Sequence, residues 1–261
     1  PEDRAAFAHS MSQLASQLTL ILPPPTRLDT VGGYVEWRSF GGLAIVFAVW
    51  ALASASGAAR GDEERGLVES VLAASLPRFA WVASRVAGFA AASFVAALAS
   101  GLGLVAGAAS GGESVGLRAP LEVAVGLAAL ALSCYSLTLL IAQLASARIA
   151  TAAAGAVLLI LFLVNTLSRT FTWLASWRWL SPFHYYELNH PLASARLDVP
   201  ATLTLLGIAV LAAAAAAVLF ESRDLGSPFL RSPSRHHAVS YELSRSRAVS
   251  YTHLTLPTIL R

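Results

Sequence analysis

The chain has 261 residues, of which 56% are hydrophobic and only 13% carry a formal charge. Soluble domains have about 25% charged residues, so this composition excludes an ordinary water-soluble protein and favours one embedded in lipid. The net charge of +3 comes entirely from residues 232–261, which carry four Arg and one Glu, so charge gives no argument for a nucleic-acid partner.

Five apolar segments are each long enough to cross roughly 30 Å of hydrocarbon as a helix. In lipid, a helix satisfies every backbone N–H and C=O within the segment itself. Buried helices of a large soluble protein would instead need polar faces and shorter apolar runs. We therefore predict an all-α, polytopic membrane helix bundle. Its predicted spans are residues 40–59, 79–109, 121–143, 149–167 and 199–220.

The N-terminal region and the distribution of Arg predict the orientation of the bundle. The chain begins with Pro1 and has no charged-then-apolar leader, so we expect a fragment in which residues 1–39 follow a missing span on the outer side. Arg is densest in the loop at residues 60–78, and Arg148 and Arg223 flank other span ends. Because basic residues near span ends favour the cytoplasm, we expect these three regions to be cytoplasmic.

A densely charged segment, residues 60–69, separates the first two predicted spans. Asp62 is a candidate N-cap, and Pro77 ends the segment before the next span. Between them, apolar residues recur on one helical face, namely Leu67, Val68, Val71 and Leu72. We expect a short amphipathic helix over residues 62–74 on the cytoplasmic membrane surface, with a merely solvated loop as the alternative.

The second predicted span is too long for a straight, perpendicular crossing. About thirty residues would extend roughly 45 Å. The span must therefore tilt, kink near Gly101 and Gly103, or leave the membrane before Gly111. Arg85 lies one to two turns inside its start, where we expect the side chain to reach the lipid headgroups as an interfacial anchor.

The predicted spans carry few groups that could drive transport or catalysis. Apart from Arg85 and Glu122, both near span ends, no Asp, Glu, Arg or His lies in them, which disfavours an ion-coupled carrier. The chain has no G-x-x-x-x-G-K-[ST] phosphate loop, so active transport would need a separate ATPase. Some polar residues in the spans should pair with neighbouring backbone or, alternatively, line a pathway: Ser133, Ser136, Thr138, Gln143 and Asn165.

Aromatic residues crowd the segment between the last two predicted spans: Trp173, Trp177, Trp179, Phe183, Tyr185 and Tyr186. Such rings favour the headgroup level of a membrane. We expect one or two interfacial or re-entrant helices on the outer face, acting as an anchoring belt or, alternatively, as an outer gate. His184 and His190 lack convergent acids or Cys, and Cys134 is the single cysteine, so we expect a packed apolar thiol and no metal or catalytic site.

The stretch GDEERGLVESVLAASLPR, residues 61–78, resembles the segment that ABC-2 type transporter permeases carry between their second and third spans. In that family the segment is the coupling helix that docks into the ATPase subunit. Pro77 stands directly before Arg78, whereas the family usually has this Pro a few residues earlier. By this resemblance the coupling residues are Asp62, Glu63, Glu64, Arg65, Gly66, Glu69, Leu72, Ala73 and Arg78.

Two further stretches are similar to the same family. WLSPFHYY, residues 179–186, resembles the segment before the last span, and FESRDL, residues 220–225, resembles the usual ending. The outer interfacial or gate segment would then comprise Trp179, Ser181, Pro182, Phe183, His184, Tyr185 and Tyr186. The resemblance implies a permease domain over residues 40–225, with five spans present of six. Residues 249–258 resemble a translated sequencing adapter, so we expect 226–261 to be a largely non-native, disordered tail.

The resemblance implies the membrane subunit of an ATP-driven exporter in a bacterial inner or plasma membrane. Its implied partners are an ABC ATPase subunit, a second permease subunit and membrane lipids. The permease would bind no cofactor, because ATP and Mg²⁺ would be used by the partner. The expected cargo is hydrophobic or amphipathic, such as a drug, an antibiotic or a lipid. The alternative is a non-transporting membrane scaffold or sensor that recruits a soluble partner through the charged loop.

Overall fold

Helices make up most of the part of the protein that the computed structural model describes, which is residues 30–73, 77–112, 116, 118–145, 147–194 and 197–222. Within these ranges, five helices are long and apolar enough to cross a membrane. This confirms the predicted all-α, polytopic bundle. The predictions for residues 1–29 and 223–261 fall outside the described residues.

The first span is the middle of one continuous helical run from Gly32 to Glu64. Thr30 caps its start, because its hydroxyl accepts a hydrogen bond from the Gly33 N–H at 3.1 Å. The run comprises α2 (Val31–Val35), the π-helical turn η1 (Glu36–Phe40), α3 (Gly41–Ser56), a second π-helical turn η2 (Gly57–Gly61) and α4 (Asp62–Glu64). The helix therefore extends beyond the predicted residues 40–59 in both directions and enters the charged segment.

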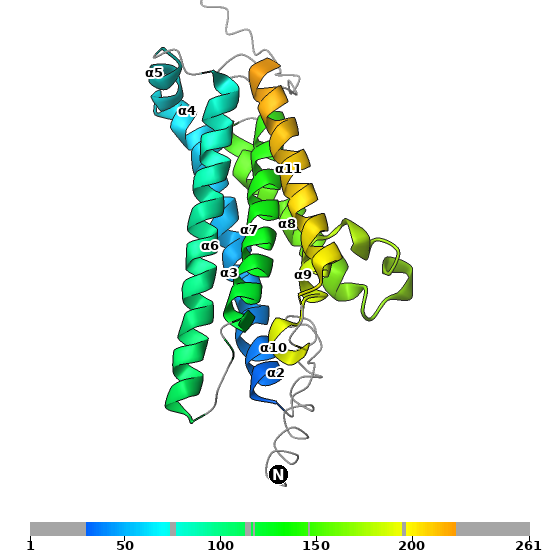
Figure 1. Cartoon of the computed structure of the whole chain (residues 1–261). Coiled ribbons are helices and arrows are strands. Elements are labelled where there is room, and N and C mark those ends of the chain that lie inside the picture. Colours follow the sequence, from blue (N-terminus) through cyan, green and yellow to red (C-terminus); the bar gives the residue numbers. More distant parts are fainter. Residues whose placement is uncertain are drawn as a thin grey trace, which may run out of the picture. The chain divides into compact units, whose positions relative to one another are not determined.

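The other four spans are single helices (Figure 1): α6 (Arg78–Ser110), α7 (Arg118–Leu144), α8 (Ala147–Leu167) and α11 (Val199–Ser222). The 33 residues of α6 would extend about 50 Å, well beyond the thickness of the hydrocarbon. The helix continues without a break through Gly101 and Gly103. A Cβ atom on Gly101 would lie 2.9 Å from backbone atoms of Pro120, so this glycine allows α7 to approach α6 closely.

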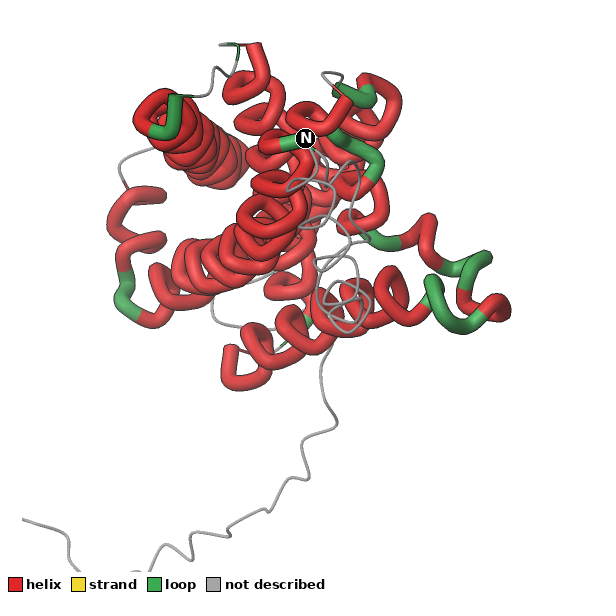
Figure 2. The backbone as a smooth tube through the Cα atoms, turned by 90° about the horizontal axis from the view of Figure 1, so that it is seen from below, coloured by secondary structure: helices red, strands yellow, loops and turns green. Residues whose placement is uncertain are grey.

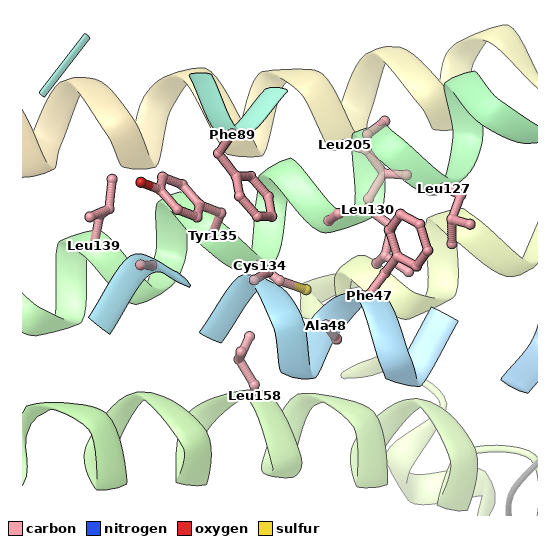
Figure 3. Packing of buried hydrophobic residues seen from close by; sticks show 14 of the residues in the cluster. Phe47, Ala48, Phe89, Leu127, Leu130, Cys134, Tyr135, Leu139, Leu158 and Leu205 are labelled. Atoms are coloured by element: carbon pink, nitrogen blue, oxygen red, sulfur yellow. The ribbon is translucent and has the colours of Figure 1, made fainter. Parts of the chain in front are cut away.

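Helix α7 lies at the centre of the bundle and contacts α3, α6, α8 and α11. Its Leu127, Leu130 and Cys134 side chains are fully buried. In the core, Phe89 of α6 stacks on Tyr135 of α7 with ring centroids 4.2 Å apart (Figure 3). The predicted packed thiol is confirmed, since Cys134 is free and buried in this core.

Short helices connect the spans at both ends of the bundle. The charged segment forms α5 (Leu67–Ala73) between α4 and α6. Between α8 and α11 lie two 3₁₀ turns and two short helices: η3 (Thr172–Leu174), η4 (Arg178–Leu180), α9 (Pro182–Glu187) and α10 (Pro191–Ser194). Figures 1 and 2 both show the portion with η3 and η4 projecting sideways from the helices. Helices α4 and α5 lie at one end of the bundle, and α2 and α10 lie at the other (Figure 1).

Candidate functional site

The charged segment changes direction at Gly66, whose backbone has a φ of +69°. This left-handed conformation suits glycine and follows the end of α4, whose last residue is Glu64 and whose C-cap is Arg65. The prediction of one helix over residues 62–74 is therefore wrong, because the segment divides into α4 and α5. Asp62 is also not an N-cap, since its backbone is helical at φ −71° and ψ −33°. The physical reason is that the helix of the first span continues through Gly61 without a stop.

The buried side chain of Arg60 forms hydrogen bonds at the C-terminal end of α7. Its side chain donates to the carbonyl oxygens of Ala142 at 2.8 Å and Ala145 at 2.5 Å, and to the Glu63 carboxylate at 3.0 Å. The residue is only 4% exposed. Because the last carbonyls of a helix lack intrahelical partners and carry partial negative charge, a guanidinium group stabilises this end of α7. Sequence reasoning used Arg60 only for orientation and missed this role.

Arg85 pairs with the charged segment. Its guanidinium lies 2.7 Å from the Asp62 carboxylate, and its Cζ lies 4.1 Å from the ring centroid of Trp81. Asp62 is 9% exposed. Arg85 thus forms an ion pair between α6 and α4, which compensates the charge of the mostly buried Asp62. Since its side chain is 40% exposed, the headgroup-anchor interpretation stays a prediction.

Arg78 and Val68 attach the segment to the last span. Arg78 donates to the carbonyl oxygen of Phe220 at 3.1 Å, near the C-terminal end of α11. Val68 of α5 is 1% exposed and packs in a small cluster with Val82, Ala217 and Phe220. Together with Arg60 and Arg85, these contacts join the charged segment to the ends of α6, α7 and α11.

Seven of the nine predicted coupling residues fall into two groups, one bonded to the bundle and one exposed. Asp62, Glu63 and Arg78 bond to the bundle or to its buried Arg60. Gly66 forms the turn, and the side chain of Leu72 lies outside the described atoms. The remaining residues point outward and are exposed: Glu64, Arg65, Glu69 and Ala73. This outward group offers two acidic side chains at the end of the molecule.

The aromatic segment at the opposite end also divides into an exposed and a buried part. Trp173, Trp177 and Trp179 are more than half exposed. The following helix α9 packs into the bundle instead, and it buries three of the predicted residues, Pro182, Phe183 and His184, together with the preceding Ser181. The anchoring-belt interpretation requires exposed indole rings, and these three Trp side chains provide them. Helix α9, by contrast, is packed as part of the bundle.

Two side chains of α9 define its contacts. The Tyr186 hydroxyl donates to the carbonyl oxygen of Phe40 at 3.2 Å, and burial, with smaller effects of two nearby carboxylates, raises the pKa of Tyr186. The Tyr185 hydroxyl donates to the carbonyl oxygen of Trp179 at 2.9 Å. Burial, followed by the nearby Arg178 charge, lowers the pKa of His184 and favours its neutral form.

Two of the five polar residues that were expected to pair with backbone, Ser133 and Thr138, do so, whereas the buried Ser136 hydroxyl has no hydrogen-bond partner. Ser133 donates to the carbonyl oxygens of Ala129 and Leu205, both at 2.8 Å, and Thr138 donates to that of Cys134 at 2.8 Å. These bonds confirm the expectation of backbone pairing for Ser133 and Thr138. Asn165 differs, because it donates to the carboxylate of Glu187 at 2.8 Å.

Glu36 organises the end of the bundle opposite the charged segment. Its carboxylate lies 2.8 Å from His190 Nδ1 and accepts hydrogen bonds from the N–H groups of Leu192 at 2.7 Å and Ala193 at 3.0 Å. One carboxylate thus joins the start of the first span to α10. Within the described ranges, no three His, Cys, Asp or Glu side chains gather closely enough to hold a metal ion.

Residues 26–221 match the family model described as "Multidrug efflux system permease Rv1217c, C-terminal domain". The matched range includes the charged segment, all five spans and the segment between the last two of them. A search of curated proteins found no match.

Proposed function

This chain belongs to the multidrug efflux permease family of that model, and from this premise we propose that it is the membrane-spanning subunit of an ATP-driven, ABC-2 type exporter. The family supports a transport permease that crosses the membrane several times. The ATPase, the cargo and the second permease subunit are parts of the proposal.

The observation that carries the proposal is the two-sided structure of the charged segment. On one side, Arg60 and Arg85 bond it to α7 and α6. On the other side, Glu64 and Glu69 are exposed. Exposed carboxylates favour a partner with a basic surface, because complementary charges speed and orient association. A segment that offers a docking surface outward and is bonded inward is suited to transmit movement.

The mechanism follows from these contacts. Closure of two ATPase subunits on ATP would displace α4 and α5. Since α4 continues the helix of the first span, that span would move with it. Arg60, Arg85 and Arg78 would carry the displacement to α7, α6 and α11. The permease itself would do no chemistry, and ATP and Mg²⁺ would bind to the ATPase.

The proposed cargo is a hydrophobic or amphipathic molecule such as a drug, an antibiotic or a lipid. The family description, which names multidrug efflux, supports this class. Two permease subunits would enclose one pathway, with like or unlike partners.

The direct test is co-purification with a phosphate-loop ATPase encoded beside the permease, combined with efflux from cells that express both. We expect the paired change Glu64→Arg and Glu69→Arg to abolish co-purification and efflux, because it reverses the charge of the exposed surface. Glu221→Arg, an exposed change at the end of α11, is the matched control. Unchanged efflux in the paired variant would contradict the coupling role, and capture of a partner other than an ATPase would favour a scaffold or sensor.

A second test concerns the side of the membrane. The single cysteine of the chain, Cys134, is buried, so introduced cysteines can be labelled in the native background. We expect Glu69→Cys to react with an impermeant maleimide only in opened membranes, and Ser110→Cys, at the far end of α6, to react in intact cells. Labelling of Glu69→Cys in intact cells would refute an ATPase-coupling role for this segment.

A further inference from the structure

Helices α9 and α10, with the residues between them, make up residues 182–194, which we call the strap. Its helix α10 lies beside α2 at the end of the bundle opposite the charged segment (Figure 1). Two carboxylates attach the strap to two different spans, Glu36 to the first span and Glu187 to α8. The strap therefore joins two helices that lie far apart in the sequence.

Three positions, each four residues after the last, attach the first helical run to the strap. A Cβ atom on Gly32 would lie 2.5 Å from the carbonyl oxygen of Leu192, so this glycine lets α10 pack directly on α2. One turn on, the Glu36 carboxylate accepts hydrogen bonds from two N–H groups of α10. One further turn on, the carbonyl oxygen of Phe40 accepts a hydrogen bond from the Tyr186 hydroxyl. Positions four apart share one helix face, so a single face of the first helical run carries the strap.

Glu36 provides the strongest of these attachments. Its carboxylate accepts hydrogen bonds from the N–H groups of Leu192 at 2.7 Å and Ala193 at 3.0 Å, and it lies 2.8 Å from His190 Nδ1. Its side chain is only 13% exposed. Hydrogen bonds to a charged group are about twice as strong as those between neutral groups. Glu36 thus fixes the position of α10 relative to the first span.

Glu187, the last residue of α9, attaches the strap to α8. Its carboxylate accepts a hydrogen bond from the Asn165 side chain at 2.8 Å and pairs with Arg169, just beyond the end of α8. The Phe183 ring of α9 also packs edge-on against Phe162 of α8, with ring centroids 5.3 Å apart. By contrast, the contacts of the charged segment reach α6, α7 and α11.

Nearer the middle of the bundle, the first span meets α8 through apolar packing. A Cβ atom on Gly155 of α8 would lie 3.3 Å from Leu52 Cδ2. Because the hydrophobic effect is non-directional, such packing sets the two helices side by side without fixing their relative position. The directional bonds at Glu36 and Glu187 supply that restraint.

We propose that the strap makes α8 follow the first span, with Glu36 and Glu187 as the positioning residues at its two ends. Displacement of α4 would move the first span, which would carry α10 with it and pull the end of α8 through α9. The proposal rests on the proposed function for the source of the displacement. The mechanical link itself needs only the permease.

The first test uses the purified full chain in lipid nanodiscs, without an ATPase. It measures the distance distribution between spin labels at Ser39→Cys, in the first helical run, and Thr170→Cys, just beyond α8. Both positions are exposed, and the native Cys134 is buried. We expect a narrow distribution that Glu36→Ala broadens, because losing a charge-assisted bond should raise the population of the detached strap by about tenfold.

Two further variants separate this role from a general loss of stability. Glu36→Gln should restore most of the narrow distribution, because its amide oxygen can accept the same N–H hydrogen bonds. Glu122→Gln removes a carboxylate whose bond to Arg118 stays within α7, so the distribution should not change. A distribution as broad in Glu122→Gln as in Glu36→Ala would show a general loosening and overturn the proposal.

A double variant tests whether the two attachments act in series. Glu187→Ala should broaden the distribution about as much as Glu36→Ala, because either change detaches one end of the strap. The double variant should then broaden it no further than the stronger single change, since a link in series is already broken. Broadening equal to the sum of the two single effects would overturn the serial link.

Efflux measurements connect the link to transport. In cells that also express the ATPase, we expect Glu36→Ala to co-purify with the ATPase normally while efflux falls by about tenfold, in line with the larger detached population. Unchanged distances or unchanged efflux in Glu36→Ala would overturn the strap's role and leave the ATPase-coupled exporter untouched. Absence of any ATPase partner for the unaltered chain would contradict the exporter, while the distance measurements would still decide whether the strap joins the two spans.

Discussion

The Arg85 guanidinium lies 2.7 Å from the Asp62 carboxylate, and this ion pair joins the second span to the end of the first. The Asp62 side chain is 12% exposed and that of Arg85 is 40% exposed. The pair is therefore stronger than a fully solvated one, while Arg85 keeps part of its hydration. Since Arg85 also stacks on Trp81, its position is determined from two sides.

The loss of stability on replacing one partner of this ion pair should depend on whether the other partner is still present. We expect Asp62→Asn and Arg85→Gln each to lower the free energy of unfolding, and the double variant to lower it by less than the two single effects combined. The expected coupling energy is about 0.5–3 kcal/mol. Unfolding in mixed micelles measures it, and strictly additive effects would show that the ion pair does not join the two helices.

Arg60→Ala should destabilise the bundle more than any change among the exposed charges of the segment. It would remove the guanidinium group that bonds to the Glu63 carboxylate and to the carbonyl oxygens of Ala142 and Ala145. Losing one partner of a buried, bonded charge costs about 3–5 kcal/mol. Arg65→Ala, an exposed change five residues on, should stay within about 0.5 kcal/mol. Equal unfolding temperatures for these two variants would contradict the role assigned to Arg60.

Gly66 should tolerate asparagine better than alanine. Its φ of +69° is a conformation that asparagine adopts more readily than other residues with a side chain. A Cβ there would meet no atom within 4 Å, so only the backbone conformation opposes the change. We expect Gly66→Ala to reduce cargo efflux at unchanged expression and Gly66→Asn to retain most of it. Similar efflux from both variants would show that the turn between α4 and α5 is not needed.

Two glycines of α6 should respond in opposite ways to alanine. At Gly101 the new Cβ would lie 2.9 Å from Pro120 backbone atoms, whereas at Gly103 it would meet nothing within 4 Å. We expect Gly101→Ala to force α6 and α7 apart and to cost about 1–3 kcal/mol. Gly103→Ala should be neutral or stabilising by up to about 1 kcal/mol, because alanine favours the helix. Thermal unfolding of the two purified variants measures this contrast.

The positions of the five spans were predictable from hydropathy alone, because lipid imposes a minimum apolar length. Their ends were less predictable. The helix of the first span runs on to Glu64, since backbone hydrogen bonds continue until Gly66 permits a reversal. Likewise, α6 continues through Gly101, which the sequence suggested as a kink and which the structure uses for close helix packing.

The candidate site was located by resemblance, but its internal organisation was not. Arg60 contacts carbonyl groups 82 and 85 residues away, and Arg85 contacts Asp62 23 residues away. Such pairs depend on which helices are neighbours, which no local spacing reveals. The same limit applies to Glu36, whose bonds to residues 190, 192 and 193 create the opposite end of the bundle.

The uninterrupted helix from Gly32 to Glu64 has a mechanical consequence. Glu36 and Asp62 lie near opposite ends of this one helix: Glu36 bonds to α10, and Asp62 pairs with Arg85 beside the exposed acids. If this helix turns about its axis, both carboxylates sweep through nearly the same angle at once. Communication across the bilayer would then travel along a single backbone, with no relay of intervening side chains.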